Sequence, residues 1–215
     1  MERKGCLYLG EKKSSALFNL IAPIYGLFYN YQKKRYVGTV EIVKSEMDIS
    51  SFDTVIDAGC GTGALCSVLK DKGMNVTGID PVIKMLNIAM SKPENKEIEF
   101  IQANALDGLP FKQKSFDVAI ASYVAHGLVE EERKRMYAEM SRITRNYVII
   151  HDYNNKRSIL TTIVEWLEGG DYFHFIKNAE PEMKDCFSEM KNCFSEVRVI
   201  NVGVRANWYI CKPIK

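Results

Sequence analysis

Apolar residues in this chain alternate between two spacings, one typical of buried strands and one typical of amphipathic helices. Short runs rich in Val and Ile are followed, in most cases, by segments whose apolar residues recur every three or four positions. Such alternation predicts a parallel sheet with right-handed crossovers and helices on both faces. The last two strand-like runs lie too close together for a crossover, so we expect them to pair antiparallel. The sequence therefore predicts an α/β three-layer sandwich: a mostly parallel seven-stranded sheet with an antiparallel last strand, plus N-terminal helices.

Glycines, prolines and capping residues set the expected boundaries of these elements. We expect strands at residues 54–57, 76–80, 98–104, 116–122, 147–150, 197–202 and 208–211. Helices are expected at 16–22, ending at Pro23, from about Lys33 to Met47, from 65 to Gly73, and at 130–143. A further helix is expected after Asp80, which would cap it, with a buried stripe from Val82 to Met90. Two more helical stripes, at 159–167 and 183–190, precede the closing strands.

Length and composition fit one globular domain. Hydrophobic residues make up 47% of the chain and charged residues 26%, and the formal net charge is +2. So small a surplus of positive charge disfavours a protein that mainly grips nucleic acid or an anionic membrane. We interpret residues 1–215 as a single domain, with an N-terminal helical cap (1–50), a ligand-binding core (51–153), a helical insert (154–195) and a closing strand pair (196–215).

Neither a membrane span nor a secretion signal is expected. The apolar stretch 16–29 is interrupted by Asn19, Pro23 and Gly26, and it falls short of the roughly 20 apolar residues that a span needs. Residues 1–13 contain no apolar run of the kind found in signal peptides. The six cysteines form no CxxC pair. We therefore expect reduced thiols, no metal site and a cytoplasmic protein.

The first strand runs into a glycine-rich turn, VIDAGCGTG at residues 55–63. Glycines let the backbone turn sharply and approach a ligand closely, and the following helix points free N–H groups at the same space. Asp80 ends the second strand about 20 residues on, where a carboxylate can accept both hydroxyls of a ribose. Together these features predict a ligand that contains adenosine, bound across the first two strands.

Two kinds of cofactor fit this geometry. Gly59, Gly61 and Ala64 also satisfy the dinucleotide pattern G-x-G-x-x-G/A, so an NAD(P)-dependent oxidoreductase remains an alternative. Asp57, directly before the turn, disfavours it, because a carboxylate there would repel a pyrophosphate and attract an amine or a sulfonium. The paired closing strands and the lack of a second domain also disfavour it.

At this point the sequence resembles the class I S-adenosylmethionine-dependent methyltransferases, which implies a Rossmann-like fold. The resemblance is carried by VIDAGCGTG, by GIDP at residues 78–81, and by IQANALDGLPF and KSFDVAIAS between residues 101 and 122. The segment LFNLIAPIYGLFY at residues 17–29 further resembles the N-terminal region of quinone-biosynthesis and other small-molecule methyltransferases. S-adenosylmethionine is therefore the expected methyl donor.

The resemblance implies a role for each matching position. Asp57 and the backbone of Ala58, Gly59, Cys60 and Gly61 would hold the methionine part of the donor. The other expected donor contacts are Asp80 for the ribose, Pro81 and Val82 beside the adenine, Asn104 and Ala105 near the adenine amino group, and Ser122.

Two positions depart from the family pattern. Asn104 stands where the family usually has Asp, and its amide oxygen can still accept a hydrogen bond, more weakly than a carboxylate. The Pro-Gly-Gly turn that many relatives have before the fifth strand is replaced by ITRNY at residues 143–147. That turn lies away from the expected site.

Catalytic candidates follow the fourth and fifth strands. His126 and His151 are imidazoles that could act as a base near neutral pH, and Tyr123 with Ser122 would line the gap between donor and acceptor. Alignment supplies much of the rate in an in-line displacement, so an elaborate catalytic group is not required.

Seven of the chain's aromatic residues lie between Tyr8 and Tyr36. From this cluster we expect Tyr25, with Phe28 and Tyr29, to fold over the donor pocket as a lid, and the resemblance places Tyr25 near the donor. The sequence thus predicts S-adenosylmethionine-dependent methyl transfer to a small-molecule acceptor by a monomer or homodimer. A protein that binds the donor without catalysis is a further alternative.

Overall fold

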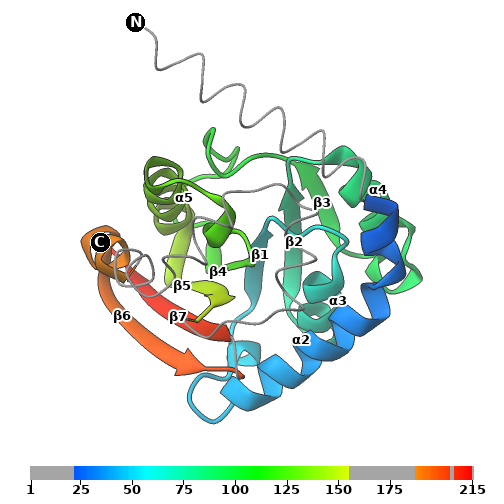
Figure 1. Ribbon diagram of the computed structural model, residues 1–215, viewed down its shortest axis with the longest axis horizontal. Coiled ribbons are helices and arrows are strands. Elements are labelled where there is room, and N and C mark those ends of the chain that lie inside the picture. The colour runs from blue at the N-terminus through cyan, green and yellow to red at the C-terminus, as the bar shows by residue number, and fades with distance from the viewer. Residues whose placement is uncertain (1–21, 155–186, 204–205, 215) are drawn as a thin grey trace, which may run out of the picture.

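The computed structural model describes residues 22–154, 187–203 and 206–214. Its strands form one seven-stranded sheet in the order β3-β2-β1-β4-β5-β7-β6 (Figure 1). The strands are β1 (Thr54–Ala58), β2 (Asn75–Asp80), β3 (Glu99–Gln102), β4 (Phe116–Ser122), β5 (Thr144–Tyr153), β6 (Phe194–Asn201) and β7 (Ala206–Pro213). The first five pair in parallel, and β7 lies antiparallel to both β5 and β6. The expected α/β fold with an antiparallel last strand is confirmed.

Helices cover both faces of the sheet and make it the middle of three layers (Figure 1). The named helices are α2 (Tyr29–Val43), α3 (Ala64–Asp71), α4 (Ile83–Ser91) and α5 (Glu130–Ile143), and residues 22–27 and 187–193 are also helical. Apolar residues of α2 and α3 pack on one face of the sheet, with Val55, Val118 and Ile149. Those of α5 pack on the other, with Ile56, Ala119 and Val148. Successive strand residues point to opposite faces, so each strand contributes to both cores.

Some boundaries differ from those expected. Pro23 lies inside the helical residues 22–27, where we predicted a helix end; proline removes one N–H but holds a helical φ. Helix α2 begins at Tyr29, four residues before the predicted Lys33, because Asn30 and Gln32 hide the apolar periodicity there. Residues 16–21 of the expected first helix and the stripe at 159–167 lie outside the residues that the structure describes.

The start of α4 also corrects a prediction. Asp80 is the last residue of β2 rather than the helix cap, since α4 is flanked by Val82 in an extended conformation. The prediction that Met90 is buried was wrong, because its side chain is 49% exposed.

Strand β5 runs to Tyr153, beyond the predicted end at Ile150, and so carries His151 and Asp152 as strand residues.

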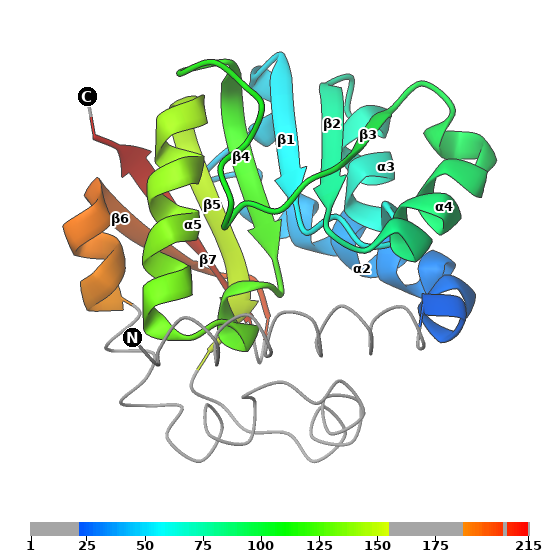
Figure 2. The same cartoon turned by 90° about the horizontal axis from the view of Figure 1, so that it is seen from above.

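The carboxyl ends of the parallel strands meet along one edge of the sheet. Figure 2 shows the arrowheads of β1, β2 and β4 pointing the same way and that of β7 pointing the other way. Ligands of such sheets bind beyond this edge, where the strand order reverses; here the reversal lies between β1 and β4. None of the helices in the described part of the chain combines the length and the apolar character needed to cross a membrane.

Candidate functional site

The turn after β1 is held close to β2 by its own backbone. The N–H groups of Gly59 and Cys60 both donate to the carbonyl of Ile79, at 2.8 and 2.9 Å. Gly59 and Gly61 have φ angles of 77° and 53°, in the left-handed region that favours glycine. A Cβ on Gly59 would lie 2.5 Å from a methyl of Val124, whereas a Cβ on Gly61 would meet no atom within 4 Å. The backbone of Gly61 therefore faces open space, as a cradle for a ligand requires.

Asp80 joins the turn to the start of α4. Its Oδ2 accepts the Gly61 N–H at 2.9 Å and its Oδ1 accepts the Val82 N–H at 2.8 Å. Burial raises the pKa of this carboxyl to about 6, against the opposing effect of these two hydrogen bonds. A carboxylate oxygen accepts more than one hydrogen bond, so Asp80 can hold the turn and still receive ribose hydroxyls.

Asp57 is buried, with 1% of its surface exposed, at the end of β1. Its Oδ2 accepts a hydrogen bond from the thiol of Cys66 at 3.3 Å, and its Oδ1 has no partner among the described residues. Burial raises the pKa of this carboxyl to about 7, and the nearby charge of Asp80 adds to the effect. A buried carboxylate oxygen without a partner is costly. An ammonium group on a ligand would satisfy it.

The neighbouring predicted contacts lie around this turn. Ala58 and Cys60 are buried, whereas Pro81 is exposed where β2 leaves the sheet. Asn104 Oδ1 accepts the Leu106 N–H at 3.0 Å, which shapes the loop after β3. Ala105 packs against the apolar cluster on the α5 face. Their expected contacts with the donor remain predictions.

The predicted lid residues have different environments. Tyr25 packs against Ala22, Val82 and Met85, beside the first residues after β2. Tyr29 is almost fully buried and its hydroxyl donates to Asn95 Oδ1 at 3.4 Å, whereas Phe28 is exposed. Among these three aromatic residues, Tyr25 alone joins the cluster that contains Val82, the residue expected beside the adenine.

Replacing Tyr25 with Ala is therefore expected to weaken donor binding. Removing the ring uncovers one side of Val82, so the dissociation constant for S-adenosylhomocysteine should rise several-fold. Calorimetric titration of wild type and Tyr25→Ala measures the change, with thermal unfolding as the check on folding. Leu27→Ala, which removes an exposed side chain from the same helical residues, is the matched control. Equal affinities of wild type and Tyr25→Ala would contradict the lid.

On the α2 face of the sheet, Ser122 and His151 lie side by side at the ends of β4 and β5. Ser122 Oγ is 3.2 Å from His151 Nδ1. His151 is 2% exposed, and burial lowers the pKa of its imidazole to about 4, so the ring is neutral. Its Nε2 has no partner within the described residues. The ring of Tyr123 lies 4.7 Å from that of His151. This geometry suits His151 for positioning its neighbours, rather than for direct contact with an acceptor.

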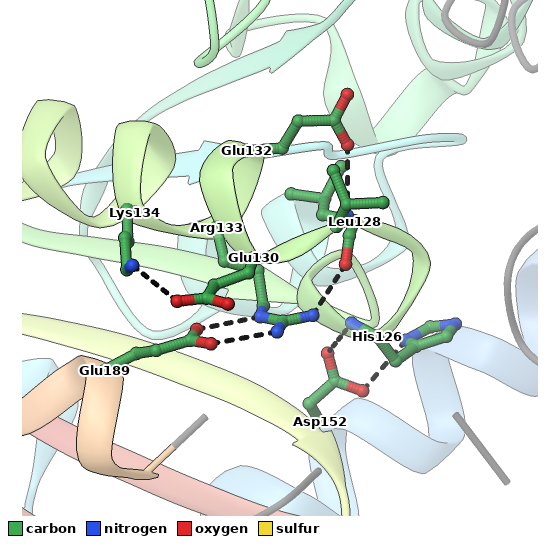
Figure 3. Close-up of polar contacts among 9 residues, drawn as sticks. His126, Leu128, Glu130, Glu132, Arg133, Lys134, Asp152 and Glu189 are labelled. Carbon is green, nitrogen blue, oxygen red and sulfur yellow. Dashed lines mark hydrogen bonds and ion pairs between the residues drawn. The ribbon is translucent and has the colours of Figure 1, made fainter. Parts of the chain in front are cut away.

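On the opposite face, His126 is paired with Asp152. Its Nδ1 is 2.9 Å from Asp152 Oδ1, and its backbone N–H donates to Oδ2 at 3.1 Å (Figure 3). Burial would raise the pKa of Asp152, but the His126 imidazole and the backbone N–H groups outweigh it and hold the pKa below its usual range. The carboxylate fixes the imidazole with its proton on Nδ1, which leaves the lone pair on Nε2.

The loop that carries His126 is tied down at its other end by Arg133. The guanidinium donates to the Leu128 carbonyl at 2.7 Å and to both carboxylate oxygens of Glu189 at 2.9 and 3.0 Å (Figure 3). Both partners of this ion pair are buried. Since Glu189 lies in the helical residues 187–193, the pair also fastens that helix to α5.

The predicted catalytic residues form two groups at the ends of β4 and β5, and the ring of Tyr153 contacts both, at 5.0 Å from that of Tyr123 and 4.9 Å from that of His126. Tyr123, Ser122 and His151 gather on the α2 face, and His126 joins Asp152 on the α5 face. Sequence reasoning missed Asp152, Tyr36 and Arg133 as partners of these residues. Alternation along β5 could have placed His151 and Asp152 on opposite faces. No pattern in the sequence indicates that Tyr36 of α2 stacks its ring edge-on to His151, at 5.9 Å.

Part of the chain matches a family of known proteins. Residues 56–150 match the family model described as a methyltransferase domain. An uncharacterised protein of Methanocaldococcus jannaschii is 33% identical over 168 residues, which are 78% of this chain and 61% of that protein. The ubiquinone/menaquinone biosynthesis C-methyltransferase of Campylobacter jejuni is 29% identical over 150 residues, or 62% of this chain and 59% of that protein. The chain therefore spans less than two thirds of the length of these two curated relatives.

A solved structure shares the fold. Human N-acetylserotonin methyltransferase, in complex with S-adenosylmethionine, superposes with a TM-score of 0.63 at 16% identity. The match covers 93% of this chain and 59% of the human one. At this identity the likeness concerns the fold, which agrees with the strand order described above.

Proposed function

The chain belongs to the class I S-adenosylmethionine-dependent methyltransferases, and from that premise we propose that it transfers the methyl group of S-adenosylmethionine to a small-molecule acceptor. The main support for this proposal is Asp57 at the glycine-rich turn, whose buried Oδ1 has no partner among the described residues. The donor's ammonium group would pair with this carboxylate oxygen. Asp80, which accepts the Gly61 N–H, would receive the ribose hydroxyls, and the open space beside Gly61 would admit the donor against the turn.

The residues of this chain hold the donor and prepare the acceptor. When bound, the donor supplies a sulfonium whose methyl group is electrophilic. Aligning donor and acceptor can lower the barrier by several kcal/mol, up to about 7–11. For an acceptor that must lose a proton, His126 Nε2 is the proposed base, and Asp152 stabilises the imidazolium that forms. Ser122 and Tyr123, at the end of β4, would line the gap between the two substrates.

Donor identity is tested by binding. We expect S-adenosylhomocysteine to bind the purified protein in a calorimetric titration and NAD not to bind, because Asp57 places a carboxylate beside the glycine-rich turn, where a pyrophosphate would need positive groups or N–H donors. Binding of NAD alone would overturn the proposal in favour of an oxidoreductase.

Catalysis is tested by turnover. Radiolabelled S-adenosylmethionine is incubated with a panel of phenols, amines, thiols and activated carbon acids, and label transfer is followed. A protein that binds the donor and methylates no member of any acceptor class would support the non-catalytic alternative.

The four described cysteines are unpaired thiols, which supports placing the protein in the reducing cytoplasm.

A further inference from the structure

One side chain from outside the glycine-rich motifs reaches the centre of the site. Tyr36 lies on α2 and packs against the apolar cluster on that face of the sheet. The charge of Asp57 raises the pKa of its phenol and hydrogen bonding with Ser122 lowers it, so the hydroxyl lies near both side chains. Its ring meets that of His151 edge-on. The Tyr36 hydroxyl therefore lies among the ends of β1, β4 and β5.

The surroundings keep this hydroxyl protonated and in place. Burial raises the pKa of the Tyr36 phenol, and the negative charge of Asp57 raises it further, so the group is an O–H donor at neutral pH. Ser122 is itself held by His151, whose imidazole is neutral.

Helix α2 is fixed to the donor side of the fold along its length. Gln32 Oε1 accepts from Thr62 of the glycine-rich turn at 3.1 Å, and Lys33 pairs with Asp71 of α3 at 2.9 Å. Lys72 pairs with Glu41 further along the helix. Helix α2 thus holds the Tyr36 ring against His151.

Resting on the proposed function, we infer that Tyr36 binds the amino-acid end of the donor, with its hydroxyl donating to the donor's carboxylate while Asp57 takes the ammonium. The chemistry of the two groups is complementary to a zwitterion. An ammonium needs an anionic acceptor, which Asp57 Oδ1 provides, and a carboxylate needs a neutral or cationic donor beside it. A phenol next to Asp57 meets that need without placing a second negative charge there.

The test compares two ligands that differ only at this end. S-adenosylhomocysteine carries the amino and carboxyl groups, whereas 5′-methylthioadenosine keeps the adenosine and the sulfur but lacks both. Tyr36→Phe removes a single hydroxyl, and a hydrogen bond to a charged group supports roughly a tenfold or larger loss of affinity. We expect that loss for S-adenosylhomocysteine and less than a twofold change for 5′-methylthioadenosine, measured by calorimetry or by displacement.

Matched variants separate the inference from a general loss of structure. Tyr31→Phe alters an exposed tyrosine of the same helix and should change neither affinity. Ser122→Ala, which releases the Tyr36 hydroxyl, should reproduce a smaller loss that is again selective for S-adenosylhomocysteine. Unchanged affinity in Tyr36→Phe, or an equal loss for both ligands, overturns the role of Tyr36 and leaves the proposed function standing. Wild type that binds neither ligand overturns both.

Discussion

Replacing Asp57 with Asn is expected to stabilise the ligand-free protein at pH 8 and to leave its stability at pH 4 almost unchanged. Burial raises the pKa of Asp57 to about 7, against an ordinary value of 3.8. Below about pH 4 the carboxyl is protonated in both the folded and the unfolded state, so it does not affect stability. Between pH 4 and 7 only the unfolded state loses the proton, and stability falls. Above pH 7 the cost is on the order of 4 kcal/mol. Thermal unfolding at the two pH values measures the difference.

Asp117 provides a control of opposite sign. A hydrogen bond with Arg145 lowers the pKa of Asp117, and hydrogen bonds from Thr54 lower it further. An acid whose pKa is lowered on folding adds stability above its unfolded pKa, and that stability is lost as the pH falls. Asp117→Asn should therefore destabilise the protein at pH 8. A melting temperature of Asp57→Asn at or below that of wild type at pH 8 would refute the assigned cost of burying Asp57.

Asp57→Asn is also expected to bind the donor poorly. Loss of a buried charge-assisted hydrogen bond to the ammonium should raise the dissociation constant for S-adenosylhomocysteine about 100-fold. In wild type, affinity should fall as the pH drops through 7, because Asp57 must be ionised to pair with the ammonium. That dependence should vanish in Asp57→Asn, leaving a weaker one near pH 6 from Asp80. Calorimetry across pH 5–8 distinguishes the two contributions.

Arg133→Met is expected to cost about 3–5 kcal/mol of unfolding free energy, because it leaves the buried Glu189 carboxylate without its guanidinium partner. The variant also removes the hydrogen bond to Leu128 that fixes the His126 loop. Chemical denaturation at neutral pH measures the loss.

Two comparison variants identify the cause of that loss. Arg133→Met combined with Glu189→Leu removes the stranded charge and should recover much of the lost stability. Lys134→Met breaks an exposed pair with Glu130 one position further along the same helix and should leave the denaturation midpoint nearly unchanged. If Arg133→Met behaves like Lys134→Met, the buried ion pair contributes nothing to stability.

Sequence patterns were most informative where one periodicity dominates. Strand β4 and helix α5 lie at their predicted residues, because the strand is buried on both faces and the helix begins with three acids that suit its dipole. The start of α2 was harder to find, since tertiary contacts such as that between Gln32 and Thr62 stabilise its first turns. Asp80 resembled a helix cap because its carboxylate does accept the Val82 N–H, although from the end of a strand.

Within the site, residues that lie close together in the sequence could be predicted, whereas contacts between distant residues could not. Asp57, the glycines and Asp80 are recognisable because a strand, a turn and a helix in one local unit position them. The partners of the histidines are different. His126 meets Asp152 across 26 positions, and Tyr36 meets His151 across α2 and β5. Such contacts depend on how a helix is rotated about its axis and on how a loop returns to the sheet, which no local pattern encodes.

The contact between Gly59 and Val124 links the two halves of the site. Because a Cβ on Gly59 would collide with Val124, any larger residue at position 59 would push apart the turn expected to hold the donor and the loop that carries His126. A ligand that shifts one of these segments would therefore also shift the other, and the two bound ligands would then be coupled. Thermodynamic reciprocity then requires the bound donor to alter acceptor affinity by the same factor as the bound acceptor alters donor affinity.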